Sequence, residues 1–311
     1  VLKGRTTGAP VGFLLANKEV KISVLPELFR PRPGHADLAG SLKYHVGIRA
    51  ILERSSARET SMRVAVGTLA RGLLATFGIE VASHVIQIGR AIFAPKEEIS
   101  FEKLKAGRNS EMNCVSREFE QATVKEIEGA KKKGDTLGGI FEVRVKGCPV
   151  GLGSHVHHAR KLDGRLAQAM LSIQAVKGAE FGLGFGMASL YGSEVHDEIF
   201  YARDKGYYRK TDRAGGIEGG MSNGEEIVVK AVLKPISTLI KPLRSVNMKT
   251  KEPELASYER SDICTVPAAS VIGEAVVAFE IANAFLEKFG GDSFAEIERN
   301  YRGYRKQIQR G

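Results

Sequence analysis

The sequence predicts an α+β fold in which a layer of buried helices lies between sheets. Two helical segments, residues 165–176 and 270–289, carry few charges and have apolar side chains around most of their circumference. Such helices lie inside a protein and not on its surface. Strand patterns occur between the helices but lack the regular strand–helix alternation of a doubly wound fold. There is no tandem repeat and no obvious linker, so residues 1–311 are expected to form one domain.

Three segments have the patterns of strands. Residues 141–145 alternate apolar and charged side chains, which is typical of a strand with one buried face. Residues 227–233 are apolar except at Lys230, which predicts a strand covered on both faces. Residues 84–93 are intermediate between these two patterns.

Further helices are predicted where apolar periodicity ends at a glycine. Glycines directly follow residues 61–77, 116–133 and 270–289, and glycine is the residue that most often ends a helix. The last segment, residues 293–310, is rich in arginine and is predicted to form an exposed helix.

The formal charge of +10 and the pI near 9.4 favour an anionic partner. Basic residues are interspersed with acidic ones, and no ribonucleoprotein motif, zinc finger or basic heptad region is found. A pocket for a small polyanion therefore fits as well as a nucleic-acid groove, and no nucleic-acid partner is expected.

The cysteines and the apolar runs indicate the compartment. The three cysteines are widely spaced and form no C-x-x-C pair, which argues against a disulfide framework and a structural zinc site. No apolar run is judged close to the roughly 20 residues of a membrane span, and no signal peptide is recognised. We expect a soluble, cytoplasmic protein with no membrane partner.

Five glycines lie within residues 215–224, and a short strand leads from them to Lys234-Pro235-Ile236-Ser237-Thr238. Glycine accepts positive φ and has no Cβ, so such a loop can turn its amides onto a phosphate or a ring edge. The alternative is a glycine-rich hairpin whose turn needs permissive residues. The loop alone does not decide between the two interpretations.

Two polar motifs near the beginning of the chain suit anion chemistry. Residues 32–37, Arg-Pro-Gly-His-Ala-Asp, place His35 between a guanidinium and a carboxylate, an arrangement that suits proton transfer beside an anion. The alternative is a loop histidine held by Asp37. Residues 53–60 put two arginines around two serines ahead of a helix, which predicts an anion site. A simple helix cap with Glu59 as its partner is the other interpretation.

A third motif, residues 258–264, directly precedes the most apolar helix. Arg260 and Asp262 would point to the same side of an extended segment. We expect Asp262 to be partly buried and able to act as a base, although a surface ion pair is the alternative. The tract His155-Val156-His157-His158 is not expected to bind a metal, because a strand would point His158 away from the other two histidines.

Taken together, these motifs resemble those of chorismate synthases. The resemblance runs nearly end to end, over residues 4–10, 32–40, 53–65, 161–185, 215–224, 234–238 and 260–293. It implies a β-α-β sandwich with two antiparallel sheets around buried helices, assembled as a homotetramer. It also implies the 1,4-anti elimination of phosphate from 5-enolpyruvylshikimate 3-phosphate to give chorismate, in the shikimate pathway to aromatic amino acids. Reduced FMN is required without net redox change.

The resemblance also assigns roles to individual residues. His35 and Asp262 would be the catalytic proton-transfer groups, with His35 near N1 of the reduced flavin and Asp262 behind N5. Arg32, Arg58 and Arg260 would hold the anionic groups of the substrate. The residues that bind FMN would be Ser56, Ala57, Arg58, Gln174, Ala175, Gly219, Lys234, Pro235, Ile236, Ser237, Thr238 and Arg260.

Family members also carry a Gly-Glu-Ser-His-Gly segment followed by an arginine-rich stretch, and neither occurs in these 311 residues. We expect both to lie before Val1. Two other functions stay open at this stage. One is a non-catalytic basic protein that binds RNA in a salt-dependent way. The other is a flavin oxidoreductase, although no nicotinamide site is recognised.

Overall fold

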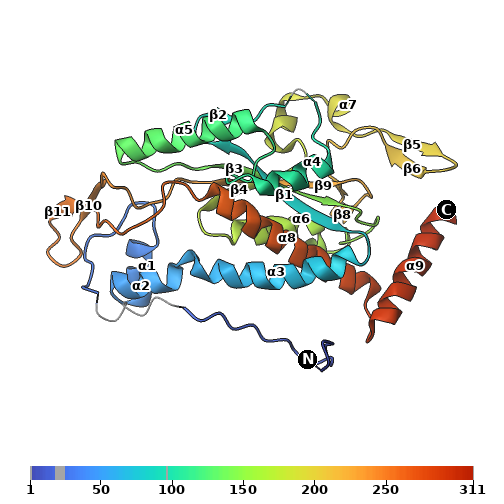
Figure 1. Ribbon diagram of the computed structural model, residues 1–311, viewed down its shortest axis with the longest axis horizontal. Helices are drawn as coiled ribbons and strands as arrows, with labels where there is room; N and C mark the ends of the chain where they lie inside the picture. Colours follow the sequence, from blue (N-terminus) through green and yellow to red (C-terminus); the bar gives the residue numbers. More distant parts are fainter. Residues whose placement is uncertain (1, 18–24, 96, 311) are drawn as a thin grey trace.

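A five-stranded antiparallel sheet forms the centre of the molecule in the computed structural model, which describes residues 2–17, 25–95 and 97–310 (Figure 1). Its strand order is β2-β1-β3-β9-β4. The register places Phe141 of β3 opposite Val85 of β1 and Ala231 of β9, and all three are buried. Opposite residues in such pairs point to the same face, so one face of the sheet is apolar. The strands are β1 (Glu80–Ile88), β2 (Ala91–Ile92), β3 (Gly139–Lys146), β4 (Val176–Phe181) and β9 (Ile227–Leu233).

Three helices cover the apolar face of the sheet: α3 (Thr60–Ala75), α6 (Leu162–Leu171) and α8 (Val266–Phe289). Helix α8 contacts β1 and β3, and it also contacts both α3 and α6 (Figure 1). Two glycines allow this packing. A Cβ on Gly273 would lie 2.4 Å from the ring of Phe141, and a Cβ on Gly67 would lie 2.5 Å from the Cβ of Ala275. The predicted α+β class and the buried helix at residues 270–289 are confirmed.

The opposite face of the sheet is covered only in part. Helices α4 (Phe101–Ala106) and α5 (Arg117–Lys133) contact β1 there. Beneath them the imidazole of His84 lies 3.1 Å from a carboxylate oxygen of Glu142, which also accepts a 2.7 Å hydrogen bond from Arg144. Burial would raise the pKa of Glu142, but the hydrogen bond from His84 and the charge of Arg144 lower it to about 2.

Several predicted boundaries were wrong. The strand expected at residues 84–93 is two strands, because the chain turns between Ile88 and Ala91. The helix expected at residues 165–176 is α6, which ends at Leu171, and Ala175 has the left-handed φ of 68°. Strand β9 is not covered on both faces. Buried residues alternate along it with partly or fully exposed ones, so only one of its faces is fully covered.

No second sheet of comparable size occurs among the described residues. The other strand pairs form three two-stranded sheets. The helix layer is therefore open on the side that faces away from the sheet, where Leu69, Phe279 and Phe13 are exposed around a hollow of about 730 Å³. The small strands are β5 (Ile199–Ala202), β6 (Gly206–Arg209), β7 (Ile217–Glu218), β8 (Met221–Ser222), β10 (Arg244–Val246) and β11 (Pro253–Leu255).

By length and composition, α8 is the one helix in the described ranges that could cross a membrane. The prediction that no apolar run comes close to this length was therefore wrong. Of its most apolar 18-residue window, 67% is buried within the fold, where it packs on the sheet and on α3.

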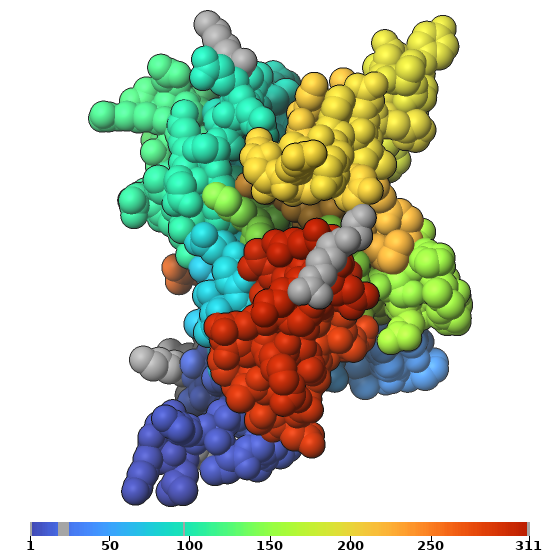
Figure 2. Space-filling model, turned by 90° about the vertical axis from the view of Figure 1, so that its right-hand side faces the viewer, coloured from blue at the N-terminus to red at the C-terminus, as the bar shows by residue number. Residues whose placement is uncertain are grey.

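The remaining helices flank this core. Helices α1 (Asp37–Tyr44) and α2 (Ile48–Ser55) precede α3, and the short α7 (Gly192–Val195) lies near the β5–β6 hairpin. Helix α9 (Phe294–Arg310) follows α8 and stands apart from the sheet (Figures 1 and 2). Tyr301 of α9 packs on Phe285 and Phe289, so the predicted final helix is confirmed and is anchored along one side.

The close contact between α3 and α8 predicts different effects on stability for substitutions at two glycines of α3, Gly67 and Gly72. Because the Cβ of alanine at position 67 would clash with the backbone of Ala275, Gly67→Ala should lower the free energy of unfolding by about 1–3 kcal/mol. Gly72→Ala is the control, since nothing lies within 4 Å of its added Cβ. That variant should be as stable as the wild type or more stable, because alanine favours a helix by about 1 kcal/mol. Urea unfolding measures both, and equal stabilities would contradict the close contact.

Candidate functional site

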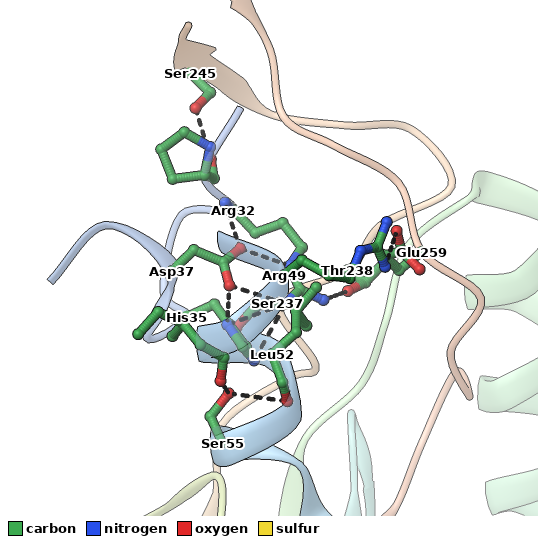
Figure 3. Close-up of polar contacts among 12 residues, drawn as sticks. Arg32, His35, Asp37, Arg49, Leu52, Ser55, Ser237, Thr238, Ser245 and Glu259 are labelled. Carbon is green, nitrogen blue, oxygen red and sulfur yellow. Dashed lines mark hydrogen bonds and ion pairs between the residues drawn. The ribbon is translucent and has the colours of Figure 1, made fainter. Parts of the chain in front are cut away.

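The loop before α1 holds a compact group of charged residues (Figure 3). Gly34, at φ 75°, completes a turn in which the N–H of His35 donates to the carbonyl of Arg32 (3.2 Å). The carboxylate of Asp37, which is 1% exposed, accepts from the Arg32 backbone N–H (3.0 Å), Nε (2.8 Å) and a terminal nitrogen (3.1 Å). His35 Nδ1 lies 2.6 Å from the same carboxylate. Burial would raise the pKa of Asp37, but the hydrogen bonds from His35 and Arg32 hold it well below its usual range.

The segment after β9 lies against this loop. Arg32 donates to the hydroxyl of the buried Thr238 (2.7 Å), and Lys234 Nζ donates to the hydroxyl of Ser237 (2.8 Å). Burial lowers the pKa of Lys234, and the charges of Lys177 and Arg32 lower it further. In the described part of the chain Lys234 has no carboxylate partner, so this cation is suited to an anionic ligand.

Gln174 and Ala175 form the turn between α6 and β4, beside Lys234. The backbone N–H of Lys234 donates to the carbonyl of Ala175 (3.0 Å). The amide nitrogen of Gln174 donates to Glu59 (2.8 Å), and because a carboxylate only accepts, this contact fixes the orientation of the amide. The amide oxygen of Gln174 is then buried without a partner in the described structure. A buried acceptor without a donor indicates a place where a ligand N–H or O–H can bind.

Residues 56–59 lie beside Gln174, because the carboxylate of Glu59 accepts the hydrogen bond from its amide. Ser56 begins the short 3₁₀ helix η2 (Ala57–Glu59), and its hydroxyl accepts from the N–H of Arg58 (3.4 Å). The Arg58 side chain is half exposed and lies 3.5 Å from Glu53. Burial would raise the pKa of Glu59, but hydrogen bonds from Arg63 and Gln174 lower it. Ionised Glu59 thereby holds the amide of Gln174 in place.

The segment before α8 also contacts the turn after β9, because Ser261 donates to the carbonyl of Thr238 (3.2 Å). Arg260 and Asp262, on either side of Ser261, are exposed. Asp262 was expected to be partly buried, and that expectation was wrong, because its segment runs along the surface before α8 begins. The alternative of an Arg260–Asp262 ion pair is not formed either: no ion pair joins them among the described residues.

The glycine-rich segment forms the β7–β8 hairpin. A Cβ on Gly215 would lie 2.3 Å from the nitrogen of Gly182, and one on Gly216 would lie 2.5 Å from the carbonyl of Glu226. These glycines are therefore required by chain packing, and the hairpin interpretation is confirmed. Gly219 at the tip is exposed, with nothing within 4 Å of an added Cβ.

The hairpin tip lies away from Gln174. The N–H of Leu162, at the start of α6, donates to the carbonyl of Gly220 (2.8 Å), whereas Gln174 follows the end of α6. Ten helical residues span about 15 Å. The structure therefore brings together all the predicted site segments except Gly219.

Sequence reasoning missed Glu59 and Arg63 as the residues that position Gln174. Arg63 contacts Glu59 (2.8 Å) and the hydroxyl of Ser172 (2.6 Å). The spacing of Glu59 and Arg63, four apart at the start of a helix, was the only available signal. The described residues contain no group of three side chains able to hold a metal ion. The assembled site is basic, with an orphaned amide oxygen, and it suits a polyanion together with a flat polar ring.

Comparisons with known proteins point the same way. The chorismate synthase family model matches residues 1–286. The chain is 54% identical to the chorismate synthase of Desulforamulus reducens, over 98% of this chain and 83% of that protein. It is 52% identical to the chorismate synthase of Brevibacillus brevis, over 100% of this chain and 84% of that protein. A solved structure described as the crystal structure of chorismate synthase superposes with a TM-score of 0.76 at 40% identity, covering 89% of this chain and 77% of that one.

Asp212 accepts a hydrogen bond from the N–H of Gly216 beside the glycine hairpin (2.7 Å), and its burial leads to a prediction about how stability depends on pH. Burial raises the pKa of Asp212 to about 6. The folded state then binds more protons than the unfolded state between pH 4 and 6, so stability falls as pH rises through this range. Asp212→Asn should remove that fall and raise stability at pH 8 by about 1 kcal/mol, allowing for screening by solvent. Thermal unfolding of both proteins from pH 4 to 8 measures the effect, and parallel pH profiles would contradict it.

Proposed function

The chain belongs to the chorismate synthase family, and we propose that the group of residues described above is the site where it carries out the family's reaction. Chorismate synthases are lyases that remove phosphate from 5-enolpyruvylshikimate 3-phosphate by 1,4-anti elimination, which gives chorismate for aromatic amino acid biosynthesis. The observation that carries the assignment of the pocket is the convergence of residues 32–37, 56–59, 174–175, 234–238 and 260–262 at one place.

The pocket residues fit the reduced flavin that the family uses. The orphaned amide oxygen of Gln174 supplies an acceptor for an N–H at the edge of a flavin ring. Lys234, which has no carboxylate partner among the residues that the structure describes, supplies a cation for the anionic parts of the cofactor. The other residues proposed to bind FMN are Ser56, Ala57, Arg58, Ala175, Pro235, Ile236, Ser237, Thr238 and Arg260. Gly219, at the tip of the hairpin, lies away from this group.

The substrate brings a phosphate and two carboxylates, and exposed arginines suit these groups. Arg58 and Arg260 are both exposed and are our first candidates. Arg32 is the third candidate, although its guanidinium already donates to Asp37 and Thr238. The net charge of +10 is consistent with an active site that must attract anions.

Proton transfer is proposed to use His35 and Asp262. When bound, reduced FMN would supply electron density that assists the departure of phosphate, with no net redox change. The exposed carboxylate of Asp262 is proposed to accept the proton at its oxygen. His35 is held through Nδ1, and its Nε2 is proposed to exchange the proton with the ligands.

The open side of the helix layer supports a further part of the proposal. We propose that the chain forms one domain, and that a second antiparallel sheet covers α3 and α8 to complete the predicted β-α-β sandwich. The exposed Leu69 and Phe279 and the hollow beside Phe13 are the supporting observations. We also propose a cytoplasmic location, which suits a biosynthetic enzyme with a phosphorylated, diffusible substrate.

The predicted homotetramer needs a contact surface, and we propose that the β5–β6 hairpin contributes to it. The hairpin projects from the body of the molecule (Figures 1 and 2). It carries Tyr201 and Tyr207, which are 63% and 65% exposed and lie with ring centroids 5.2 Å apart. Tyrosine is enriched at protein interfaces.

One prediction tests the reaction and the role of Asp262. Wild-type protein supplied anaerobically with chemically reduced FMN and 5-enolpyruvylshikimate 3-phosphate should release chorismate and phosphate. Asp262→Asn should lower kcat by at least about 100-fold, because a positioned base typically contributes that much, while FMN binding stays within a few fold of wild type. The control Asp204→Asn, at an exposed position in the hairpin turn, should behave as wild type. Near-normal turnover of Asp262→Asn would reject the role.

Another prediction concerns the assembly of the homotetramer. The double variant Tyr201→Glu and Tyr207→Glu should shift the protein from tetramers to smaller species, because like charges would face the partner surface. Its thermal unfolding should change little, since both rings lie mainly outside the core. Light scattering after size exclusion measures the mass, and Val156→Glu, at another exposed position, is the control. An unchanged tetramer in the double variant would rule out the hairpin as a contact.

A further inference from the structure

We propose that Asp37 is the positioning residue of this site: its buried carboxylate fixes the tautomer of His35 and the orientation of Arg32, so that Nε2 of His35 is the atom that exchanges protons with the pocket. The catalytic meaning of this inference rests on the proposed function. Its structural content does not, because the tautomer of His35 can be measured without flavin or substrate.

The carboxylate of Asp37 is almost saturated with donors (Figure 3). One oxygen, Oδ2, accepts from the backbone N–H and Nε of Arg32, and the other, Oδ1, accepts from a terminal nitrogen of Arg32. The imidazole nitrogen Nδ1 of His35 is 2.6 Å from Oδ1, which is the shortest of the four contacts. An ionised carboxylate with these partners and 1% exposure has very little freedom to move.

These contacts decide which ring nitrogen carries the proton. A carboxylate only accepts and a guanidinium only donates, so Nδ1 cannot satisfy both Asp37 and the Arg32 nitrogen that lies 3.0 Å away. The shorter contact, to a charged oxygen, requires a proton on Nδ1. In the neutral imidazole Nε2 then carries the lone pair. It lies 3.3 Å from the same Arg32 nitrogen, which can donate to it, and the side chain keeps 24% of its surface exposed.

The same carboxylate acts at longer range through Arg32. The terminal nitrogen of Arg32 that does not contact Asp37 donates to the hydroxyl of Thr238, and the carbonyl of Thr238 accepts from Ser261. Asp37 therefore connects the histidine loop to the turn after β9 and to the segment that carries Asp262. This arrangement favours a holding role for Arg32 over the direct grip on substrate that the sequence suggests.

The molecule contains a second trio of a histidine, a carboxylate and an arginine that serves as an internal comparison. His84, Glu142 and Arg144 form a similar carboxylate-centred group on the opposite face of the sheet. There the imidazole is only 2% exposed, so no ligand can reach it. The trio around Asp37 differs because the imidazole of His35 keeps 24% of its surface exposed.

The test is a measurement of histidine tautomers by long-range ¹⁵N–¹H NMR on the full chain, without flavin or substrate. The signals of His35 are identified by their loss in His35→Gln. In the wild type at pH 8, His35 should be in the Nδ1–H form. In Asp37→Asn the single amide oxygen should turn toward the donors of Arg32 and the NH₂ group toward Nδ1, so the ring should change to the Nε2–H form.

Glu142→Gln is the matched control, because it alters the other trio and should change His84 alone. A wild-type His35 in the Nε2–H form, or a ring whose tautomer is the same in Asp37→Asn, would overturn the proposal. If Asp37→Asn does not fold, the tautomer of His35 in the wild type decides whether the proposal holds.

Turnover of Asp37→Asn should fall at least about tenfold with FMN affinity within a few fold of wild type. An inactive wild type with the expected tautomer would reject the proposed function and leave the positioning role intact.

Discussion

The ion pair between Arg32 and Asp37 is the contact on which the organisation of the site depends. It joins the loop before α1 to the turn after β9 through Thr238, and that turn in turn contacts the segment before α8 through Ser261. A buried ion pair is costly unless its remaining hydrogen bonds are satisfied, and here the carboxylate has four donors. Loss of either partner would leave the other charged and buried, so the two residues act as one unit.

The sheet places the rest of the site around this pair. Strands β4 and β9 are antiparallel, with Val176 opposite Leu233, so the residue before β4 and the residue after β9 are adjacent. This register is why Ala175 and Lys234 share a hydrogen bond although 59 positions, 234 minus 175, separate them in the sequence. Gln174 then reaches Glu59 at the start of α3, which packs on α8. Polar residues at the ends of core elements thus gather at one edge of the helix layer.

The sequence predicted what depends on local pattern. The β9 segment, the apolar helix α8 and the loop of residues 32–37 could be recognised because periodicity and turn residues determine them. It did not predict the roles of Glu59 and Arg63, because their partners Gln174 and Ser172 lie more than 100 positions away and nothing local marks the contact. The burial of Asp262 was misjudged for a similar reason: proximity to an apolar helix in sequence does not mean that a side chain faces it. The glycines at residues 215 and 216 looked like a ligand loop but are required by the close approach of neighbouring backbone.

The central claim is that the converging segments form one pocket for flavin and substrate, and a crystal structure of the protein with FMN and 5-enolpyruvylshikimate 3-phosphate tests it most directly. The account predicts a flavin ring packed against residues 174–175 and 234–238, with the amide oxygen of Gln174 accepting a hydrogen bond from the ligand and the substrate beside His35. A flavin bound elsewhere, with the amide oxygen of Gln174 still lacking a donor, would contradict it.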